Sequence, residues 1–325
     1  MPFAAPPTDG GFEAPSGPTC VKWFLGICLY FRSLGKDLDV SPLYPNASGA
    51  VKVGVYVDVP DISSNGGRGM RFDTLRRFAC RGGAEVLHLN AYVSYDQERA
   101  EEDRRYRDGT VDFYRILRDF GYKVVTKRVR WFTDEDGTEF PKSNVDMELA
   151  VDLVQQASKL DRVLLLTGDG DFARLVHDVQ RQGTRVEVMG FKGISERLRL
   201  AADQFTSGYL IPGLLPVQSS TGVAWGEVES RVRGICYDFR VDRGFGFLRF
   251  VKNIEGAMWI TDTRLEGSAY DTAFVHASEL EKAKVEIESL PSRDIVLEFD
   301  LAMGKKEGFE ARNITLAHRY ASYEL

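Results

Sequence analysis

The sequence is poor in cysteine, in long apolar runs and in net positive charge. Its four cysteines, spread over 325 residues, form no Cys-x-x-Cys pair and are too few for a disulfide framework. The longest apolar stretch, residues 21–31, is too short to span a bilayer. It follows Pro- and Gly-rich sequence without a basic start, which argues against a secretory signal. We therefore expect a cytoplasmic protein that makes no contact with a membrane.

The formal net charge of −6 excludes a global basic field, so any nucleic-acid binding has to come from local patches. The 43% hydrophobic content is ample for a core, and the length suggests two domains or one large one. Residues 1–48 are expected to be an N-terminal extension that is partly disordered.

Residues 51–211 alternate apolar strands with amphipathic segments of helical length. This order predicts an α/β fold of three layers, with a parallel sheet between helices. Strands are expected at 51–57, 84–92, 121–130, 162–167 and 185–190, and helices at 72–81, 97–120, 146–160, 172–182 and 194–202. In the helix at 146–160, we expect the core-facing side chains to be Met147, Ala150, Val151 and Val154.

Residues 212–224 are rich in Pro, Ser, Gly and Thr and are expected to be a linker. Beyond it the sequence changes to short alternating strands, which suggests a small β-barrel. The expected division is an α/β domain at 49–211, the linker, and a second domain at 225–320. Barrel strands are expected at 227–239, 244–251, 273–276, 295–303 and 310–317, with a helix at 277–287.

Acidic residues follow the apolar strands of the first domain. Asp58 ends the first strand, and Asp169 and Asp171 follow a later one within a glycine turn. Ligands of open α/β sheets bind at the carboxyl ends of the strands, and Asp146 begins a helix that could start at the same edge. Such a cluster is unfavourable without a cation, and its hard oxygen ligands suit Mg²⁺ or Mn²⁺.

Each acid also has a simpler interpretation. Asp146 and Asp171 could be helix N-caps, and Asp58 could be a turn residue. The glycine turn also resembles the metal-binding acids of haloacid-dehalogenase-type phosphatases. Those enzymes carry a second acid two residues after the nucleophile, and Pro60 stands at that position here. The joint occurrence of the acids on one edge favours a metal site over separate caps.

Three motifs resemble the NYN domain of the PIN-like nuclease superfamily, in its LabA-type branch. They are Val57 to Ile62, Lys142 to Asp152, and Thr167-Gly168-Asp169-Gly170-Asp171-Phe172. The resemblance implies metal-dependent RNA cleavage, with Asp58, Asp146, Asp169 and Asp171 as metal ligands. It also implies that Thr167 lines the site and that Lys142 contacts phosphate.

Asp61 departs from that pattern, since the family usually has Asn three residues after the first Asp. An acid at position 61 could bind metal directly or through water, or could reduce activity. The following segment, 63–69, lacks the spacings of known phosphate-binding loops and is expected to be a mobile surface loop.

The second domain places aromatic residues two apart on two strands: Phe245 and Phe247, then Phe274 and His276. If the strands are neighbours, the four rings form a platform suited to stacking unpaired bases. The alternative is that the rings are core. Basic residues crowd the same segment, among them Arg240 and Arg243.

These motifs resemble the cold-shock domain, an OB-fold that binds single-stranded RNA or DNA. The usual Trp of the first strand falls at Asp238, and Tyr237 or Phe239 could substitute for it. In the first domain, Lys127 and Arg128 could also guide a nucleic-acid backbone toward the acids.

The sequence thus predicts a Mg²⁺- or Mn²⁺-dependent ribonuclease that cuts single-stranded RNA, which the second domain grips. Single-stranded DNA as a further ligand and a homo-oligomeric state stay open. The alternative is an RNA-binding regulatory protein with little or no turnover, because Asp61 alters the acidic site.

Overall fold

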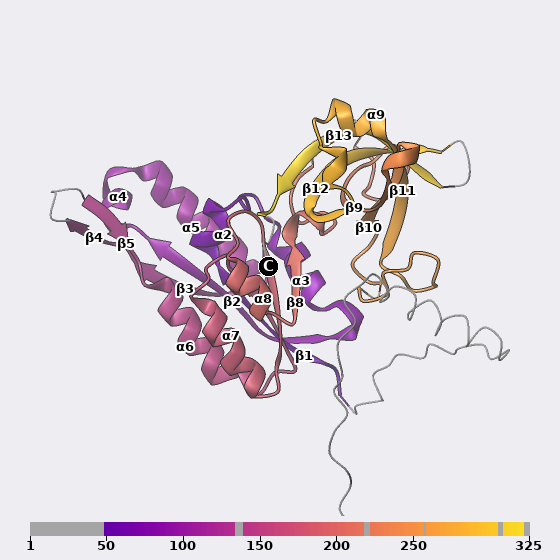
Figure 1. The fold of residues 1–325 in the computed structure, drawn as a ribbon. Helices are drawn as coiled ribbons and strands as arrows, with labels where there is room; N and C mark the ends of the chain where they lie inside the picture. The colour runs from indigo at the N-terminus through magenta and orange to yellow at the C-terminus, as the bar shows by residue number, and fades with distance from the viewer. Residues whose placement is uncertain (1–48, 134–138, 218–221, 257, 305–307, 322–325) are drawn as a thin grey trace, which may run out of the picture. The chain divides into compact units, whose positions relative to one another are not determined.

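The computed structural model describes residues 49–133, 139–217, 222–256, 258–304 and 308–321. Residues 50–325 form one compact unit. It contains a six-stranded sheet with helices and a five-stranded barrel (Figure 1). Among the described helices, none has the length and apolar character needed to cross a membrane.

All six strands of the sheet are parallel, which confirms the predicted α/β fold. The spatial order is β3-β2-β1-β6-β7-β8, so the chain moves outward from β1 on one side and then resumes at β6 on the other. The order reverses between β1 and β6, which makes this pair the topological switch point. The strands are β1 (Lys52–Asp58), β2 (Glu85–Tyr95), β3 (Lys123–Arg128), β6 (Arg162–Leu166), β7 (Arg185–Gly190) and β8 (Gln204–Ser207).

Helices bury apolar side chains on both faces of the sheet. On one face, Val55 of β1 belongs to a core with Leu75 of α3 and Leu117 of α5. On the other face, Tyr56 of β1 shares a core with Leu149 of α6. Burial on both faces explains why these strands are nearly continuous apolar runs. The helices are α2 (Val59–Ser64), α3 (Phe72–Ala79), α4 (Gln97–Glu102), α5 (Arg104–Asp119), α6 (Val145–Ala157), α7 (Phe172–Arg181) and α8 (Glu196–Ala201), and the short 3-10 helices are η1 (Arg81–Gly83) and η2 (Gly208–Leu210).

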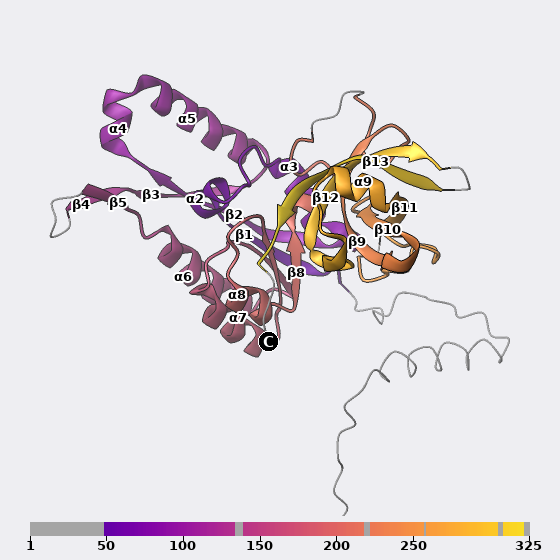
Figure 2. The ribbon, with the colours of Figure 1, turned by 45° about the horizontal axis from the view of Figure 1, so that its top comes forward.

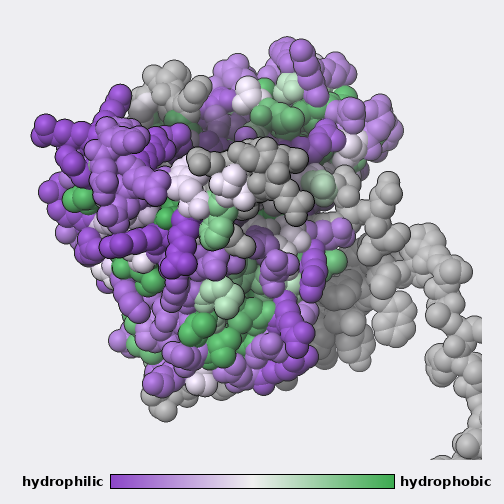
Figure 3. Space-filling model, turned by 90° about the vertical axis from the view of Figure 1, so that its left-hand side faces the viewer, coloured by the Kyte–Doolittle hydropathy of each residue, from purple (hydrophilic) through white to green (hydrophobic). Residues whose placement is uncertain are grey.

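The predicted core face of α6 is wrong. Met147, Val151 and Val154 are exposed, whereas the buried positions are Val145, Leu149, Leu153 and Ala157. The helix is apolar on two sides, so spacing alone could not decide which side meets the sheet. Its second apolar side is exposed. The face of the molecule in Figure 3 is mostly hydrophilic and carries several hydrophobic patches.

Three further features differ from the expected elements. The helix predicted at 97–120 is two helices, because Asp103 is extended and caps α5 by accepting a hydrogen bond from the Tyr106 N–H. A hairpin of β4 (Arg130–Thr133) and β5 (Glu139–Lys142) precedes α6. Packing also continues past residue 211, since Leu214 and Leu215 are buried in the core of the sheet.

The five C-terminal strands form a closed barrel in the order β10-β11-β13-β12-β9 (Figure 2). Its interior includes Leu248, Phe250, Val275 and Phe299. The pairing of β11 with β13 is parallel, and the other pairings are antiparallel. The elements are β9 (Arg231–Arg240), η3 (Val241–Arg243), β10 (Phe245–Val251), β11 (Tyr270–His276), α9 (Ala277–Lys282), η4 (Ile287–Ser289), β12 (Ser292–Met303) and β13 (Phe309–Arg319).

Polar contacts join the barrel to the sheet. The Tyr320 hydroxyl, which follows β13, hydrogen-bonds the Ser207 Oγ atom at 2.7 Å, and both residues are buried. Arg199 of α8 pairs with Asp294 of β12 at 2.9 Å. Removing one partner of a buried hydrogen bond or of a largely buried ion pair lowers the free energy of unfolding. These two contacts therefore stabilise the packing of the barrel against the sheet.

Candidate active site at the sheet edge

Asp58 lies at the carboxyl end of β1, next to the switch point. Its side chain is only 7% exposed, and its Oδ1 atom accepts a hydrogen bond from the Asp61 N–H at 3.2 Å. Burial, reinforced by the charges of Asp61, Asp146 and Asp169, raises the pKa of Asp58 to about 6. The structure therefore brings three other acids within electrostatic reach of Asp58, as the sequence predicted for two of them.

Asp61 uses both carboxylate oxygens inside the protein. Its Oδ2 atom accepts from the Gly168 N–H at 2.6 Å, and its Oδ1 atom accepts from the Asn65 side-chain amide at 2.8 Å. Burial raises the pKa of Asp61, while these hydrogen bonds oppose the rise. The acid thus ties α2 to the glycine turn that follows β6.

The turn after β6 holds Asp169 in a defined position. Thr167 is fully buried, and its Oγ1 atom accepts from the Asp169 N–H at 3.2 Å. The Asp169 Oδ1 atom in turn accepts from the Asp171 N–H at 2.9 Å. A Cβ atom on Gly170 would lie 2.4 Å from the Ser195 Oγ atom and 3.0 Å from its Cβ atom, so any larger residue here would displace the Ser195 side chain.

Asp171 differs from the other acids. It occupies the N-cap position of α7, and its side chain makes no capping hydrogen bond. The residue is exposed, as is Asp146 in the first turn of α6, but unlike Asp146 it does not act on the pKa of Asp58. The acids that raise the pKa of Asp58 are Asp61, Asp146 and Asp169. Asp171 therefore lies at the same edge but faces solvent.

Asn65 is a site residue that the sequence did not reveal. It lies in the segment expected to be mobile, but its amide holds Asp61 and its carbonyl accepts from the Lys192 N–H at 2.7 Å. A Cβ atom on Gly193 would lie 3.0 Å from its Oδ1 atom. No spacing in the sequence connects residue 65 with residues 192 and 193, so only the fold could show this contact.

The oxygen-rich donor set suits a hard cation such as Mg²⁺ or Mn²⁺. Burial is the main cause of the raised pKa of Asp58, and the charges of the neighbouring acids add to it. Within the described ranges, however, no three acidic, histidine or cysteine side chains are arranged to hold one ion. The carboxylates at this edge of the sheet are of the type that binds a divalent metal. Among the described residues, they are not arranged around one ion position.

The basic residues predicted beside the acids differ in their surroundings. Lys127 forms a close ion pair with Glu148 of α6, so part of its charge is neutralised within the protein. Arg128 is exposed at the end of β3. Lys142 pairs with Arg130 in the ladder between β4 and β5, and its side chain lies outside the described residues.

Three of the four predicted platform rings contact one another on the outside of the barrel. The centroids of Phe245 and Phe274 are 5.7 Å apart in a stacked arrangement, and Phe247 meets Phe274 edge-on at 6.0 Å. All three are partly exposed, while the intervening Leu248 and Val275 are buried. The rings therefore belong to the outer surface and not to the core.

The remaining predicted residues lie around this triad. His276 is opposite Phe245 in the ladder, and its Nδ1 atom accepts from the Ser278 N–H at the start of α9. Arg240 and Arg243 are exposed near the same end of β10. Of the two candidates for the missing first-strand ring, Phe239 is buried and Tyr237 is 41% exposed. Only Tyr237 is therefore available to a ligand.

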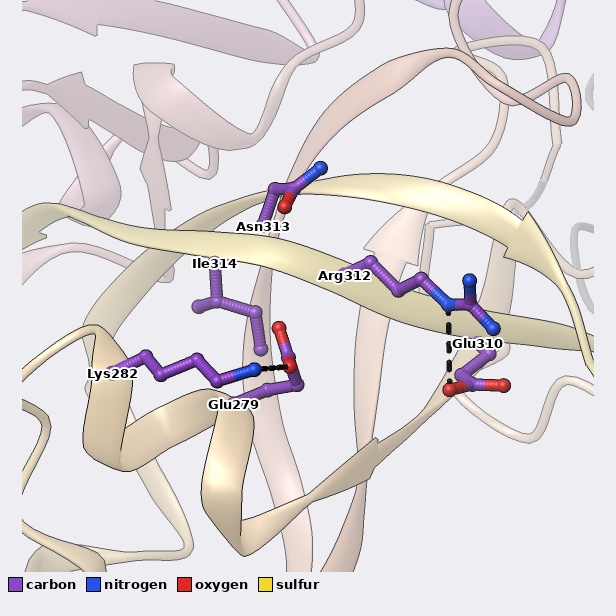
Figure 4. Close-up of a pocket in the computed structure, with 6 residues that line it drawn as sticks. All are labelled: Glu279, Lys282, Glu310, Arg312, Asn313 and Ile314. Atoms are coloured by element: carbon purple, nitrogen blue, oxygen red, sulfur yellow. Dashed lines mark hydrogen bonds and ion pairs between the residues drawn. The ribbon is translucent and has the colours of Figure 1, made fainter.

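The barrel also has a polar pocket of about 430 Å³ between α9 and β13 (Figure 4). Its charged side chains form two ion pairs among themselves, Lys282 with Glu279 and Arg312 with Glu310. The pocket contains none of the predicted site residues, and its internal pairing leaves little net charge for a ligand.

The parallel sheet between helices and the acids beyond the carboxyl end of β1 define a doubly wound α/β protein with acids at its switch point. Residues 52–214, just over half of the chain, match the NYN domain family model, and the chain belongs to this nuclease-like family of the PIN superfamily. The family assignment made from the three motifs is confirmed.

Two known proteins resemble the chain. It is 31% identical over 124 residues to the "Low amplitude and bright protein LabA" of Synechococcus elongatus, covering 37% of this chain and 63% of LabA. The match thus spans less than two thirds of that relative. A crystal structure of a protein of unknown function from Vibrio parahaemolyticus aligns with a TM-score of 0.41 and 26% identity, over 50% of this chain and 96% of the other.

Proposed function

We propose that the protein is a metal-dependent ribonuclease that hydrolyses phosphodiester bonds of single-stranded RNA. The observation that carries the proposal is the gathering of Asp58, Asp61, Asp146 and Asp169 at the switch point of an NYN-type sheet. Asp58 is buried, Asp61 and Asp169 are partly buried, and Asp146 is exposed. A carboxyl group whose pKa is strongly raised beside other acids is typical of a functional site.

In this proposal, Asp58, Asp146 and Asp169 would hold Mg²⁺ or Mn²⁺, and Asp171 would approach the ion from the solvent side. A bound cation of this kind polarises water for attack and offsets the charge of the phosphodiester. Asp61 positions the turn that carries Asp169 by accepting a hydrogen bond from the Gly168 N–H. Thr167 holds the same turn by accepting a hydrogen bond from the Asp169 N–H. Lys142 and Arg128 would bind the RNA backbone beside the acids.

We also propose that the barrel is a cold-shock-like OB-fold that holds the single strand. Its closed five-stranded order and the outward triad of Phe245, Phe247 and Phe274 support this assignment. Each ring can stack on an unpaired base, a contact worth about 1–3 kcal/mol. His276, Arg240 and Arg243 would flank the stacked bases.

A second candidate is an RNA-binding regulatory protein with little turnover. It is favoured by the lack, among the described residues, of three side chains arranged around one ion. It is also favoured by Asp61, whose oxygens are both engaged in hydrogen bonds.

The test is incubation of the full-length protein with end-labelled single-stranded RNA and Mg²⁺ or Mn²⁺. We expect cleavage that is lost with EDTA and lost in Asp169→Asn, with RNA binding retained. Asp178→Asn is the matched control, because Asp178 pairs with Arg181 on the surface of α7. Binding without cleavage in the parent protein would support the second candidate, and equal cleavage by parent and Asp169→Asn would exclude the proposed site.

A further inference from the structure

The β4–β5 hairpin projects from the acid-bearing edge of the sheet (Figures 1 and 2). It follows Arg128 at the carboxyl end of β3, and its second strand ends at Lys142, just before α6. Asp146 lies in the first turn of α6, four residues after the hairpin. The hairpin is therefore the surface element that leads directly to one of the candidate metal ligands.

The first strand of the hairpin exposes two neighbouring aromatic rings. Trp131 is 43% exposed and Phe132 is 45% exposed. Successive side chains of a strand point to opposite faces, so each face of the hairpin carries one ring. Each face of the hairpin thus presents one partly exposed ring on which an unpaired base can stack.

Two arginines lie just before these rings in the sequence. Arg128 and Arg130 are exposed, and neither has an ion-pair partner among the side chains that the structure describes. Tyr95 is opposite Arg128 in the ladder between β2 and β3 and stacks on Tyr106, with ring centroids 6.3 Å apart. The alternation of rings and positive charge is the pattern that binds a single-stranded nucleic acid.

The positive charge of the hairpin lies next to the sheet. Arg128 ends β3, and Arg130 begins β4. Charge complementarity therefore favours a polyanion at the base of the hairpin, beside the sheet.

We propose that Arg128, Arg130, Trp131 and Phe132, here called the hairpin surface, form a second single-strand contact. An unpaired base stacks on the ring of each face that the strand crosses, the arginines bind the adjoining phosphates, and the strand continues toward Asp146. This inference rests on the proposed function, because it assigns the path by which single-stranded RNA reaches the acids. The hairpin surface is distinct from the phenylalanine triad of the barrel.

The test is fluorescence anisotropy of a labelled oligouridylate with the full-length protein in EDTA, which prevents cleavage. We expect Trp131→Ala, and separately the double variant Arg128→Ala/Arg130→Ala, to weaken binding about tenfold. The matched control is Leu200→Ala, since Leu200 is 68% exposed on α8 and belongs to no predicted site. Each variant is also compared in a Phe245→Ala/Phe274→Ala background, so that tight binding to the barrel does not mask the effect.

A second measurement locates the contact. Photocrosslinking with 4-thiouridine RNA should label a peptide that contains residues 128–133, and Trp131→Ala should reduce that label. Unchanged affinity in both backgrounds, without a crosslink at 128–133, would overturn the inference and leave the hairpin as a surface for another protein. The outcomes are separable: loss of cleavage in Asp169→Asn with normal binding by Trp131→Ala rejects only the hairpin surface, whereas weaker binding by Trp131→Ala without any metal-dependent cleavage rejects only the catalytic proposal.

Discussion

The Oδ2 atom of Asp61 accepts a hydrogen bond from the Gly168 N–H at 2.6 Å. This contact joins the residue that departs from the family pattern to the turn that carries Asp169. It changes the interpretation of Asp61, which the sequence offered as a further metal ligand or a cause of lost activity. Because both of its carboxylate oxygens accept hydrogen bonds within the protein, we propose that it positions the acidic edge.

Replacing Asp61 should separate these roles. Asp61→Ala leaves the buried Gly168 N–H without an acceptor and should lower the free energy of unfolding by about 1–3 kcal/mol. Asp61→Asn should lose less, because an amide oxygen can still accept that hydrogen bond. Urea unfolding measures both values, and hydrogen exchange at Gly168 reports the contact directly. Equal stability of all three proteins would contradict the positioning role.

Asp58→Asn should stabilise the protein when divalent metals are removed. The pKa of Asp58 is raised from about 3.8 to about 6, so between these values the folded state holds a proton that the unfolded chain has released. The free energy of unfolding therefore falls as the pH rises through this interval. Above it, the parent carries a penalty of up to about 3 kcal/mol that the amide avoids.

Thermal melts in EDTA between pH 4 and pH 8 measure this difference, with Asp178→Asn as the exposed control. The gain should be small near pH 4 and largest above pH 6. A variant that is less stable than the parent at neutral pH would contradict the burial and repulsion assigned to Asp58.

The phenylalanine triad should bind single strands without supporting the barrel. Phe245→Ala/Phe274→Ala removes two stacked rings, and each lost base contact costs about 1–3 kcal/mol of binding free energy. Anisotropy with labelled single-stranded RNA measures the loss, and a melt checks the fold. Leu316→Ala, an exposed apolar position on β13, should bind as the parent does. Equal binding by the double variant would assign the rings another role.

The two apolar sides of α6 should respond differently to substitution. Leu149→Ala and Leu153→Ala each create a cavity in the core and should cost about 2–5 kcal/mol of unfolding free energy. Met147→Gln and Val151→Thr lie on the exposed side and should change it by about 0.5 kcal/mol or less. Urea unfolding of the four variants makes the comparison, and the reverse ranking would mean that α6 packs through its other side.

Local patterns were enough for five of the six strands of the sheet, because apolar strands buried on both faces have a clear signature. They missed β8, α2 and the β4–β5 hairpin. They were also enough to select Asp58 and Asp169, since both follow strands that end at one edge. The NYN assignment, which the family match confirms, rested on the same residues. Patterns failed at α6, where two apolar sides compete and only contact with the sheet selects Leu149 over Val151.

By itself, the sequence determined a parallel α/β sheet with acids after its strands, followed by a five-stranded β-rich part, because these features depend on residues close together in the chain. The tertiary structure alone decided the switch point between β1 and β6 and the hydrogen bonds of Asp61 to Asn65 and Gly168. It also decided the outward position of the phenylalanine triad and the exposure of Trp131. These depend on which distant segments pack together, and that choice is made by the burial of the whole core.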